Sequence, residues 1–327
     1  MNAMFGLLLQ DHGQEHGAAA VQGAEQAGEH AAEGFNAGKT IIEHVANSGL
    51  DHPLIHLPKI AGIDFSVTKH VFMLWLVAAF AFVLVTLTVR RYLKQDRLIP
   101  SGFMSVIEYL VEFVRDSIAK PNVGRQWVNT WTPLLLTLFV FIFSANLIGL
   151  IPVFDVLGLL NHYVFHAGHD SFLAKVIHGG TTATANFNVT AALATITFFS
   201  IIVAGTLAHG FVKHWMNLVP HGLAWPIYIL LIPIEMMGLF VKPFALTMRL
   251  AANMTGGHIA ILAILSFVFL FAELFKSSIV GIAAGLIASV PLAVGISGLE
   301  IIVVLVQAYV FTLLTAVFIG MAIHVHH

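Results

Sequence analysis

The stretch KPFALTMRLAANM, residues 242–254, places an arginine, Arg249, in the middle of an apolar segment that runs from residue 226 to 275. A guanidinium stays charged in proteins, and placing it at the centre of a bilayer costs at least about 2.5–3.5 kcal/mol. A chain that keeps such a residue usually gives it a partner or a task. The stretch therefore predicts a membrane-embedded helix that carries a functional cation.

The composition of the whole chain also predicts a membrane protein. Apolar residues make up 58% of the 327 positions and charged residues only 10%, whereas soluble domains carry about 25% charged residues. The absence of cysteine excludes disulfides and cysteine-ligated metals. The formal net charge of -2 provides no basic surface for a nucleic acid.

Five apolar segments are long enough to cross a bilayer. The first is 70–89, and Arg90, Arg91, Lys94 and Arg97 follow it directly. By the positive-inside rule this flank is cytoplasmic, so we expect the N-terminus outside and, after five crossings, the C-terminus in the cytoplasm. The other segments are, in chain order, 132–153, 188–210, 226–275 and 279–324.

The last two segments are longer than the roughly 20 residues that one upright helix needs. Each could form two short helices, or one helix that is strongly tilted or nearly horizontal. Pro233 and Pro243 favour breaks in the first of them, because proline removes a backbone donor. We expect an all-α integral membrane fold with about five crossings and two long, tilted C-terminal helices.

Two regions outside the spans complete the organisation. Residues 103–119 are amphipathic, which predicts a helix lying in the plane of the cytoplasmic interface. Residues 1–60 are polar and rich in histidine, which predicts a solvated tail on the outer side, ahead of a membrane domain at 61–327. The apolar run at 4–9 is too short for a signal peptide, so we expect the tail to be retained.

Histidines recur in this tail and in the outer loop predicted at 154–187. His162, His166 and His169 are spaced by four and three residues, so they could share one face of a helix. A zinc site is one interpretation, and a polar loop is the other. The loop lacks acidic or cysteine ligands at defined positions. We therefore expect neither a metal nor a cofactor.

Polar residues in the 226–275 segment follow helical spacing. Glu235, Lys242 and Arg249 are seven residues apart, and Asn253 follows one turn later, so all four would lie near one stripe. His258 comes nine residues after Arg249, half a turn out of phase, and faces another direction. The first two residues could also be a simple charge pair near the cytoplasmic surface.

The last segment holds Glu300 and Gln307, again seven residues apart on one stripe. A carboxylate and an imidazole can pass protons at accessible pH, whereas a guanidinium cannot. Glu300 and His258 therefore suit a proton path, and Arg249 suits a fixed electrostatic barrier. Structural roles stay open: Arg249 could pair with Glu300, and His258 could serve in packing. Asn146 fits either a helix–helix contact or a channel.

These stretches resemble subunit a of the F-type ATP synthase, the membrane stator beside the rotating c-ring. The resemblance covers most of the chain from about residue 65 onward. The essential arginine, the asparagine and the final-helix glutamine of that family correspond to Arg249, Asn253 and Gln307, and a glutamate and a Lys-Pro correspond to Glu235 and Lys242. The matching stretches are VEFVRD at 111–116, FSANLIGLIP at 143–152, KPFALTMRLAANM at 242–254, and Glu300 through QAYVF at 307–311.

Two departures from some bacterial members of that family are informative. Those members carry glutamate in place of His258 and histidine in place of Glu300, so the pair is exchanged here, as in mitochondrial members. Some members carry aspartate in place of Gly149, and this chain has no carboxylate there.

The resemblance implies two half-channels that carry protons to and from the c-ring. It implies that His258 and Glu300, with Asn253 nearby, line the outer half-channel, and that Glu235 contributes to the inner one. It also implies a non-catalytic subunit in a bacterial inner membrane, with the c-ring and the peripheral-stalk b subunits as partners. The chain has no Walker-type loop, so we expect it to bind no nucleotide.

Two other classes of function are weighed against this one. A stand-alone secondary proton-coupled transporter would also bury arginine, glutamate and histidine, but no internal repeat is visible in the sequence. An intramembrane enzyme would need a nucleophile or a metal motif such as HExxH, and the spans contain none.

Overall fold

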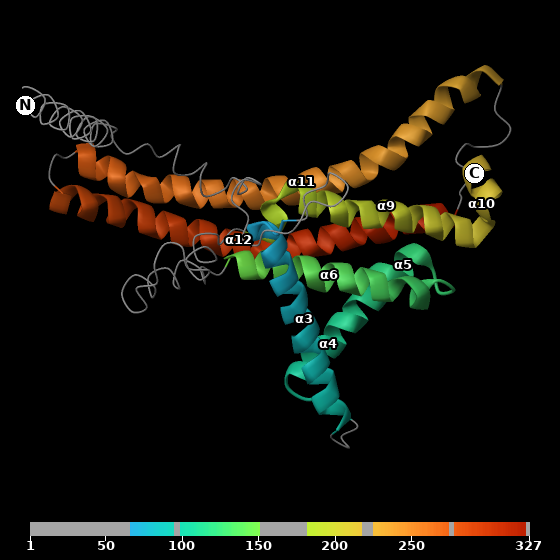
Figure 1. Ribbon diagram of the computed structural model, residues 1–327, viewed down its shortest axis with the longest axis horizontal. Helices are drawn as coiled ribbons and strands as arrows, with labels where there is room; N and C mark the ends of the chain where they lie inside the picture. The colour runs from blue at the N-terminus through green and yellow to red at the C-terminus, as the bar shows by residue number, and fades with distance from the viewer. Residues whose placement is uncertain (1–65, 95–98, 151–181, 218–224, 275–277, 325–327) are drawn as a thin grey trace, which may run out of the picture.

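Figure 1 shows the computed structural model of the protein, which describes residues 66–94, 99–150, 182–217, 225–274 and 278–324. The predicted tail and most of the predicted outer loop, with its histidines, lie outside these residues. The elements of the described chain are helices, which confirms the predicted all-α class. Within that part, five helices are long and apolar enough to cross a membrane, as predicted.

Three of these helices have ordinary transmembrane length. They are α3, Lys69–Leu93, α6, Val128–Leu150, and α9, Phe187–His209. The side chain of Asn186 caps α9 by accepting a hydrogen bond from the backbone N–H of Asn188 at 2.8 Å. Gly210 ends the same helix with a φ of 85°, a conformation open to glycine. The short helix α10, Phe211–Met216, follows directly.

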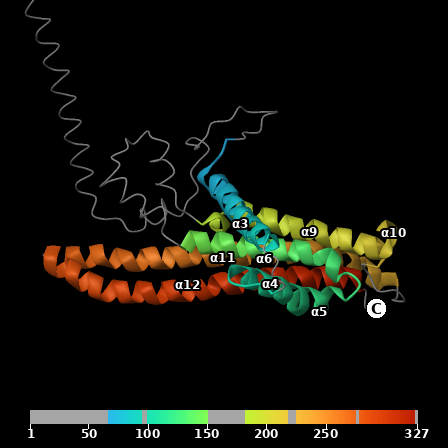
Figure 2. The same ribbon diagram turned by 90° about the horizontal axis from the view of Figure 1, so that it is seen from below.

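The last two helices are far longer. α11, Trp225–Leu274, has 50 residues, and α12, Ser278–Ile323, has 46. At 1.5 Å per residue they measure about 75 and 69 Å, more than twice the roughly 30 Å of a hydrocarbon core. They lie side by side, with α6 and α9 alongside, and α3 crosses this layer steeply (Figure 1, Figure 2). The long pair must therefore be strongly tilted in a bilayer that α3 spans.

α11 is continuous through Pro233 and Pro243, where the sequence favoured breaks. Both prolines lie in the first half of α11, the half that bends away from α12 (Figure 1). Membrane helices tolerate proline because neighbouring groups satisfy the backbone atoms that proline leaves unpaired. The helix therefore bends where breaks were expected.

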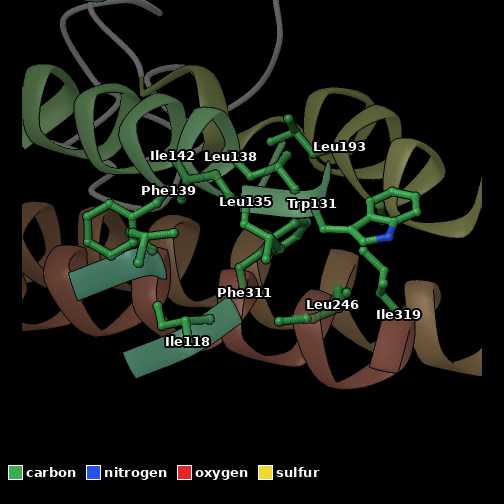
Figure 3. Close-up of a cluster of buried hydrophobic side chains, with 14 of the residues drawn as sticks. Ile118, Trp131, Leu135, Leu138, Phe139, Ile142, Leu193, Leu246, Phe311 and Ile319 are labelled. Carbon is green, nitrogen blue, oxygen red and sulfur yellow. The ribbon is translucent and has the colours of Figure 1, made fainter. Parts of the chain in front are cut away.

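Apolar side chains from α6, α9, α11 and α12, joined by some from residues 114–123, fill the layer, and Figure 3 shows part of this core. Leu135 and Ile142 of α6 are fully buried, as are Leu246 of α11 and Ile319 of α12. The core members on α11 lie between residues 239 and 254, and those on α12 lie between 304 and 323; Leu193, Ala194, Ile201 and Ala204 come from α9. The core therefore uses the middle of α11 and the second half of α12.

The predicted in-plane helix at 103–119 is divided between two environments. Its parts are α4, Phe103–Glu112, the π-helical segment η1, Phe113–Ala119, and α5, Lys120–Val123. α4 buries no side chain, whereas η1 inserts Val114 and Ile118 into the core. Only the first part therefore remains free to lie on a membrane surface, and the second part belongs to the packed domain.

Candidate functional site

α11 carries two polar side chains on its exposed surface, Arg249 and Asn253. Leu250 and Met254, next to them in the chain, are buried. The helix thus turns its apolar side to the core and its cationic side outward. Among the described residues, Arg249 makes no hydrogen bond or ion pair. In particular, no ion pair joins Arg249 to Glu300, so the structural pairing considered from the sequence is not formed.

Small residues accompany this exposed polar pair. Ala252 and Gly256 of α11 are exposed, and nothing lies within 4 Å of the position that a Cβ of Gly256 would take. α12 exposes Gly295 and Gly298 with the same open space. Residues this small allow another helix to approach closely. An exposed cation within an apolar helix, with such surroundings, is a candidate site for contact with another helix.

Glu300 of α12 has the opposite surroundings, because only 5% of its surface is exposed. Its carboxylate packs against Gly257 of α11, where a Cβ would collide with Oε1 and stand 2.9 Å from the carboxyl carbon. A glycine at this position is what admits the carboxylate between the two helices. The second oxygen, Oε2, is buried and has no hydrogen-bond partner within the described chain. Burying a carboxylate without full pairing is costly, which makes this position a candidate for the functional site.

His258 follows Gly257 directly, and its Nε2 lies 2.5 Å from Oγ1 of Thr182. Thr182 precedes the short 3-10 helix η3, Ala183–Ala185, which lies between α6 and α9 in the chain. Thr182 is fully buried and occupies the space that a Cβ of Gly149 would need. His258 is therefore tied to an internal segment, on a different side of α11 from Arg249.

A second hydrogen bond ties α6 to the same internal segment. Thr184 Oγ1 donates to Oδ1 of Asn146, and both side chains are fully buried. Thr255 Oγ1 of α11 donates to the carbonyl of Ala185 at 3.2 Å. Asn146 of α6 therefore contacts the internal segment at η3, and the choice between a helix–helix contact and a channel role stays a prediction. We refer to Asn146, Thr182, Thr184, His258 and Glu300 as the buried polar cluster.

The buried polar cluster combines two groups that titrate with three that hydrogen-bond. It extends from α6 through η3 to α11 and α12, at the edge of the apolar core. A carboxylate and an imidazole can exchange protons directly or through water, and hydroxyl and amide groups can both donate and accept hydrogen bonds. The arrangement is therefore chemically able to conduct a proton. Arg249 does not belong to it, because its side chain is exposed.

The first half of α11 holds the two other polar candidates. Lys242 Nζ lies 5.7 Å from the centre of the Phe318 ring of α12, within the range of a cation–π contact. Glu235 is partly exposed. The two residues form no ion pair in the described part of the chain, so the charge pair considered from the sequence is not formed.

Gln307 lies on the packed side of α12. It is buried, and so are Val304 and Ala308 beside it. Glu300, one heptad earlier, shares this side, so the stripe that the sequence placed along α12 faces into the protein. Gln307 is therefore placed to act on neighbouring side chains within the chain, with little direct access to an outside partner.

Sequence reasoning does not select Thr182 and Thr184, because they fall within the predicted outer loop at 154–187. Both are fully buried, so residues 182–186 form an internal segment and not a solvated loop. A signal was present in the alternation of threonine and alanine at 182–185, which lacks the charges of a solvated loop. Among the described residues, no group of three or more His, Asp or Glu could hold a metal ion.

Comparison with known proteins places these residues in a family context. Residues 71–320 match the family model described as ATP synthase A chain, and this range includes every residue of the site. A protein named ATP synthase subunit a 2 from Chlorobium luteolum is 41% identical over 308 residues, which cover 91% of this chain and 79% of the relative.

Two further relatives carry similar names. ATP synthase subunit a 2 from Prosthecochloris aestuarii is 40% identical over 294 residues, covering 88% of this chain and 80% of the relative. ATP synthase subunit a from Anaeromyxobacter dehalogenans is 36% identical over 332 residues, covering 95% and 76%. The similarity therefore extends over nearly the whole chain.

Proposed function

The chain belongs to the ATP synthase A chain family, and from this premise we propose that it is the proton-translocating stator subunit of an F-type ATP synthase. In this role it offers two half-channels to a rotating c-ring and couples proton flow to rotation. The observation that carries the proposal is the exposed guanidinium of Arg249, which has no partner among the described residues.

The exposed face of α11 is the surface proposed to meet the ring. A deprotonated rotor carboxylate faces lipid only at a high cost, so it needs a cation where it passes the stator. Arg249 supplies that cation, and the small residues Ala252 and Gly256 beside it let a rotor helix come close. Since a guanidinium does not release its proton, Arg249 also blocks direct proton transfer between the two half-channels.

The buried polar cluster supports an outer half-channel. Glu300 and His258 titrate, and they come from neighbouring helices at the same level of the long pair. Protons from the outer side would reach the ring through them, with Asn146 as a polar lining group. Asn253 lies with Arg249 on the exposed face, so its proposed place is where the half-channel meets the ring. Gln307 is proposed to position side chains near Glu300.

The first half of α11 supports the inner half-channel. Glu235 is partly exposed there, in the part of the helix that bends away from α12 (Figure 1). A carboxylate at this place could pass protons to the cytoplasm. Each charge that crosses the full membrane gains about 2.3 kcal/mol per 100 mV, which is the energy that the two half-channels direct through the ring.

The remaining assignments concern orientation and partners. Arg90 and Arg91 at the end of α3 favour a cytoplasmic location for that end, which puts the N-terminus outside and the C-terminus inside. The proposed setting is a bacterial inner membrane, with the c-ring and the peripheral-stalk b subunits as partners. The nucleotide chemistry is assigned to other subunits of the synthase, and this chain is proposed to bind neither nucleotide nor cofactor.

The test is ATP-driven proton pumping by vesicles that contain the whole synthase with Arg249→Ala. We expect coupled pumping and proton-driven ATP synthesis to fall by about 100-fold or more, the scale of losing a preorganised electrostatic partner. Arg91→Ala is the matched control, because it removes an exposed arginine outside the site. Pumping that stays intact in Arg249→Ala, with the synthase assembled, would refute the barrier role.

A further inference from the structure

We propose that Thr182 is a positioning residue for proton transfer, whose hydroxyl holds the imidazole of His258 beside Glu300 in both protonation states of the ring. This inference rests on the proposed function for the reaction in which His258 takes part. The contacts that single out Thr182 are independent of that function.

The first observation is the partner that His258 has. Oγ1 of Thr182 lies 2.5 Å from Nε2 of the ring. A hydroxyl accepts a hydrogen bond from a protonated ring nitrogen and donates one to an unprotonated nitrogen. A carbonyl could only accept, and an ammonium group could only donate. A threonine at this place therefore keeps its hydrogen bond when the proton on Nε2 is gained or lost, as a residue that passes protons requires.

The second observation is how firmly Thr182 is held. It is fully buried, and a Cβ on Gly149 of α6 would collide with its Oγ1, Cβ and Cγ2 atoms. Two residues further on, Thr184 donates to Asn146 of α6. The carbonyl of Ala185 then accepts from the side chain of α11 at Thr255. Because a buried β-branched side chain has few rotamers, this packing fixes the position of the hydroxyl.

The third observation is the carboxylate that packs against the residue before His258. The carboxylate of Glu300 packs against Gly257, the residue adjacent to His258. The elements packed around this segment carry further charged or titratable residues: Lys69, His70, Arg90 and Arg91 on α3, His209 on α9, and Glu235, Lys242, Arg249 and Glu273 on α11. Of all these groups and Glu300, Glu300 is the one whose carboxylate packs against the residue next to His258 in the chain. A ring that turned away from Thr182 would lose its fixed position relative to this carboxylate.

Thr182→Val tests the role, because valine keeps the shape of the side chain and removes the hydroxyl. In vesicles with the whole synthase, we expect proton-driven ATP synthesis to fall about 10-fold, the effect of one lost hydrogen bond. We also expect the midpoint of the pH–rate profile to shift by about 1 pH unit. The reason is that the lost hydrogen bond stabilises the protonated and the neutral ring by different free energies. Thr182→Ser should restore both the rate and the midpoint.

Thr197→Val is the matched control. Thr197 is also a buried threonine, and its hydroxyl hydrogen-bonds Thr315 of α12 at 3.1 Å, with no contact to His258. This variant should keep the parental rate and midpoint. The amount of assembled synthase is measured for each variant and used to normalise the rates. Thr182→Ala also lacks the hydroxyl, so it must reproduce the shifted midpoint even if the valine variant assembles poorly.

Several outcomes would overturn the inference. If Thr182→Val lowers the rate at every pH and leaves the midpoint of the pH–rate profile unshifted, the variant has lost packing only. If Thr182→Ser does not restore the rate and the midpoint, the hydroxyl is not the group that matters. A failure of the proposed function is distinguishable: His258→Ala with parental rates removes His258 itself from the proton path. If His258→Ala is defective and Thr182→Val matches the parent, only the positioning role is wrong.

Discussion

The exposed face of α11 around Arg249 and the buried polar cluster around Glu300 differ in almost every physical respect. Arg249 is exposed and has no partner among the described residues, whereas Glu300 is enclosed against Gly257. One region exposes an always-charged group on the surface of the chain, and the other encloses a titratable group between two helices. The difference teaches that one pair of helices can hold an exposed fixed charge and a buried titratable group on separate faces, which is the separation that the proposed function needs.

The separation comes from helical geometry. Arg249 and His258 are nine residues apart on α11, which is half a turn out of phase. Arg249 is exposed accordingly, while His258 reaches Thr182 on an internal segment. The fixed cation therefore lies close, along the helix, to the buried polar cluster of the proposed proton path without being part of that cluster. The proposed barrier at Arg249 and the proposed path at His258 can therefore be tested separately by single substitutions.

The largest change expected within the buried region is that of Glu300→Gln. Glutamine keeps the shape and cannot carry a proton, so proton-driven ATP synthesis should slow by roughly 10–100-fold, the scale of losing a group that transfers protons. Synthesis driven by an imposed pH gradient in vesicles measures this rate. Glu112→Gln, an exposed glutamate on α4, is the control. If Glu300→Gln leaves the rate unchanged, the buried polar cluster has a structural role and does not carry protons.

A smaller effect is expected from adding one methyl group on either side of α11. Gly257→Ala places a Cβ against Glu300, whereas Gly256→Ala places it in open space. Overpacking of this kind destabilises by about 1–3 kcal/mol. The temperature at which the solubilised synthase loses this subunit should therefore fall for Gly257→Ala.

For Gly256→Ala the packing within the chain should be unaffected, so the amount of subunit in the membrane should match the parent. Gly256→Ala should instead weaken the contact between this subunit and the ring. The measurement is the amount of ring that co-purifies with the subunit. Equal instability of the two variants would contradict the assignment of one glycine to the interior and the other to the exposed face.

The smallest effect is expected at Lys242, the other cation of α11. Its Nζ lies over the Phe318 ring, so Lys242→Met should remove a contact worth about 0.5–1 kcal/mol and shift the melting temperature of the synthase slightly. Lys213→Met, an exposed lysine on α10, is the control. If Lys242→Met leaves the stability unchanged and strongly lowers proton transport, Lys242 belongs to the proton path. The contact with Phe318 would then not be its main role.

Much of the architecture could be predicted because membranes constrain sequences strongly. A helix that satisfies its own backbone is one of few structures that can cross lipid, so long apolar segments indicate spans directly. The prolines were a weaker guide. Pro233 and Pro243 were expected to break α11, and the helix only bends, because packing can satisfy the backbone atoms that proline leaves unpaired.

The residues of the site were found from sequence to different degrees. Charged residues inside apolar segments are rare and expensive, so Arg249 and Glu300 are visible without a structure. Threonine carries no such signal, because it occurs in loops, in cores and on helices alike. Thr182 therefore remained hidden inside a predicted loop, although it is buried and bonded to a residue 76 positions away.

The sequence by itself determined the helical membrane class, the approximate spans and the presence of charged and titratable residues within the last two apolar segments. These follow from local hydrophobicity, helical period and the cost of charge in lipid, which act within one segment. Only the tertiary structure decided that Glu300 enters the space left by Gly257, and that Thr182 reaches His258 past Gly149. Such contacts depend on which helices pack together and how closely, and no single segment contains that information.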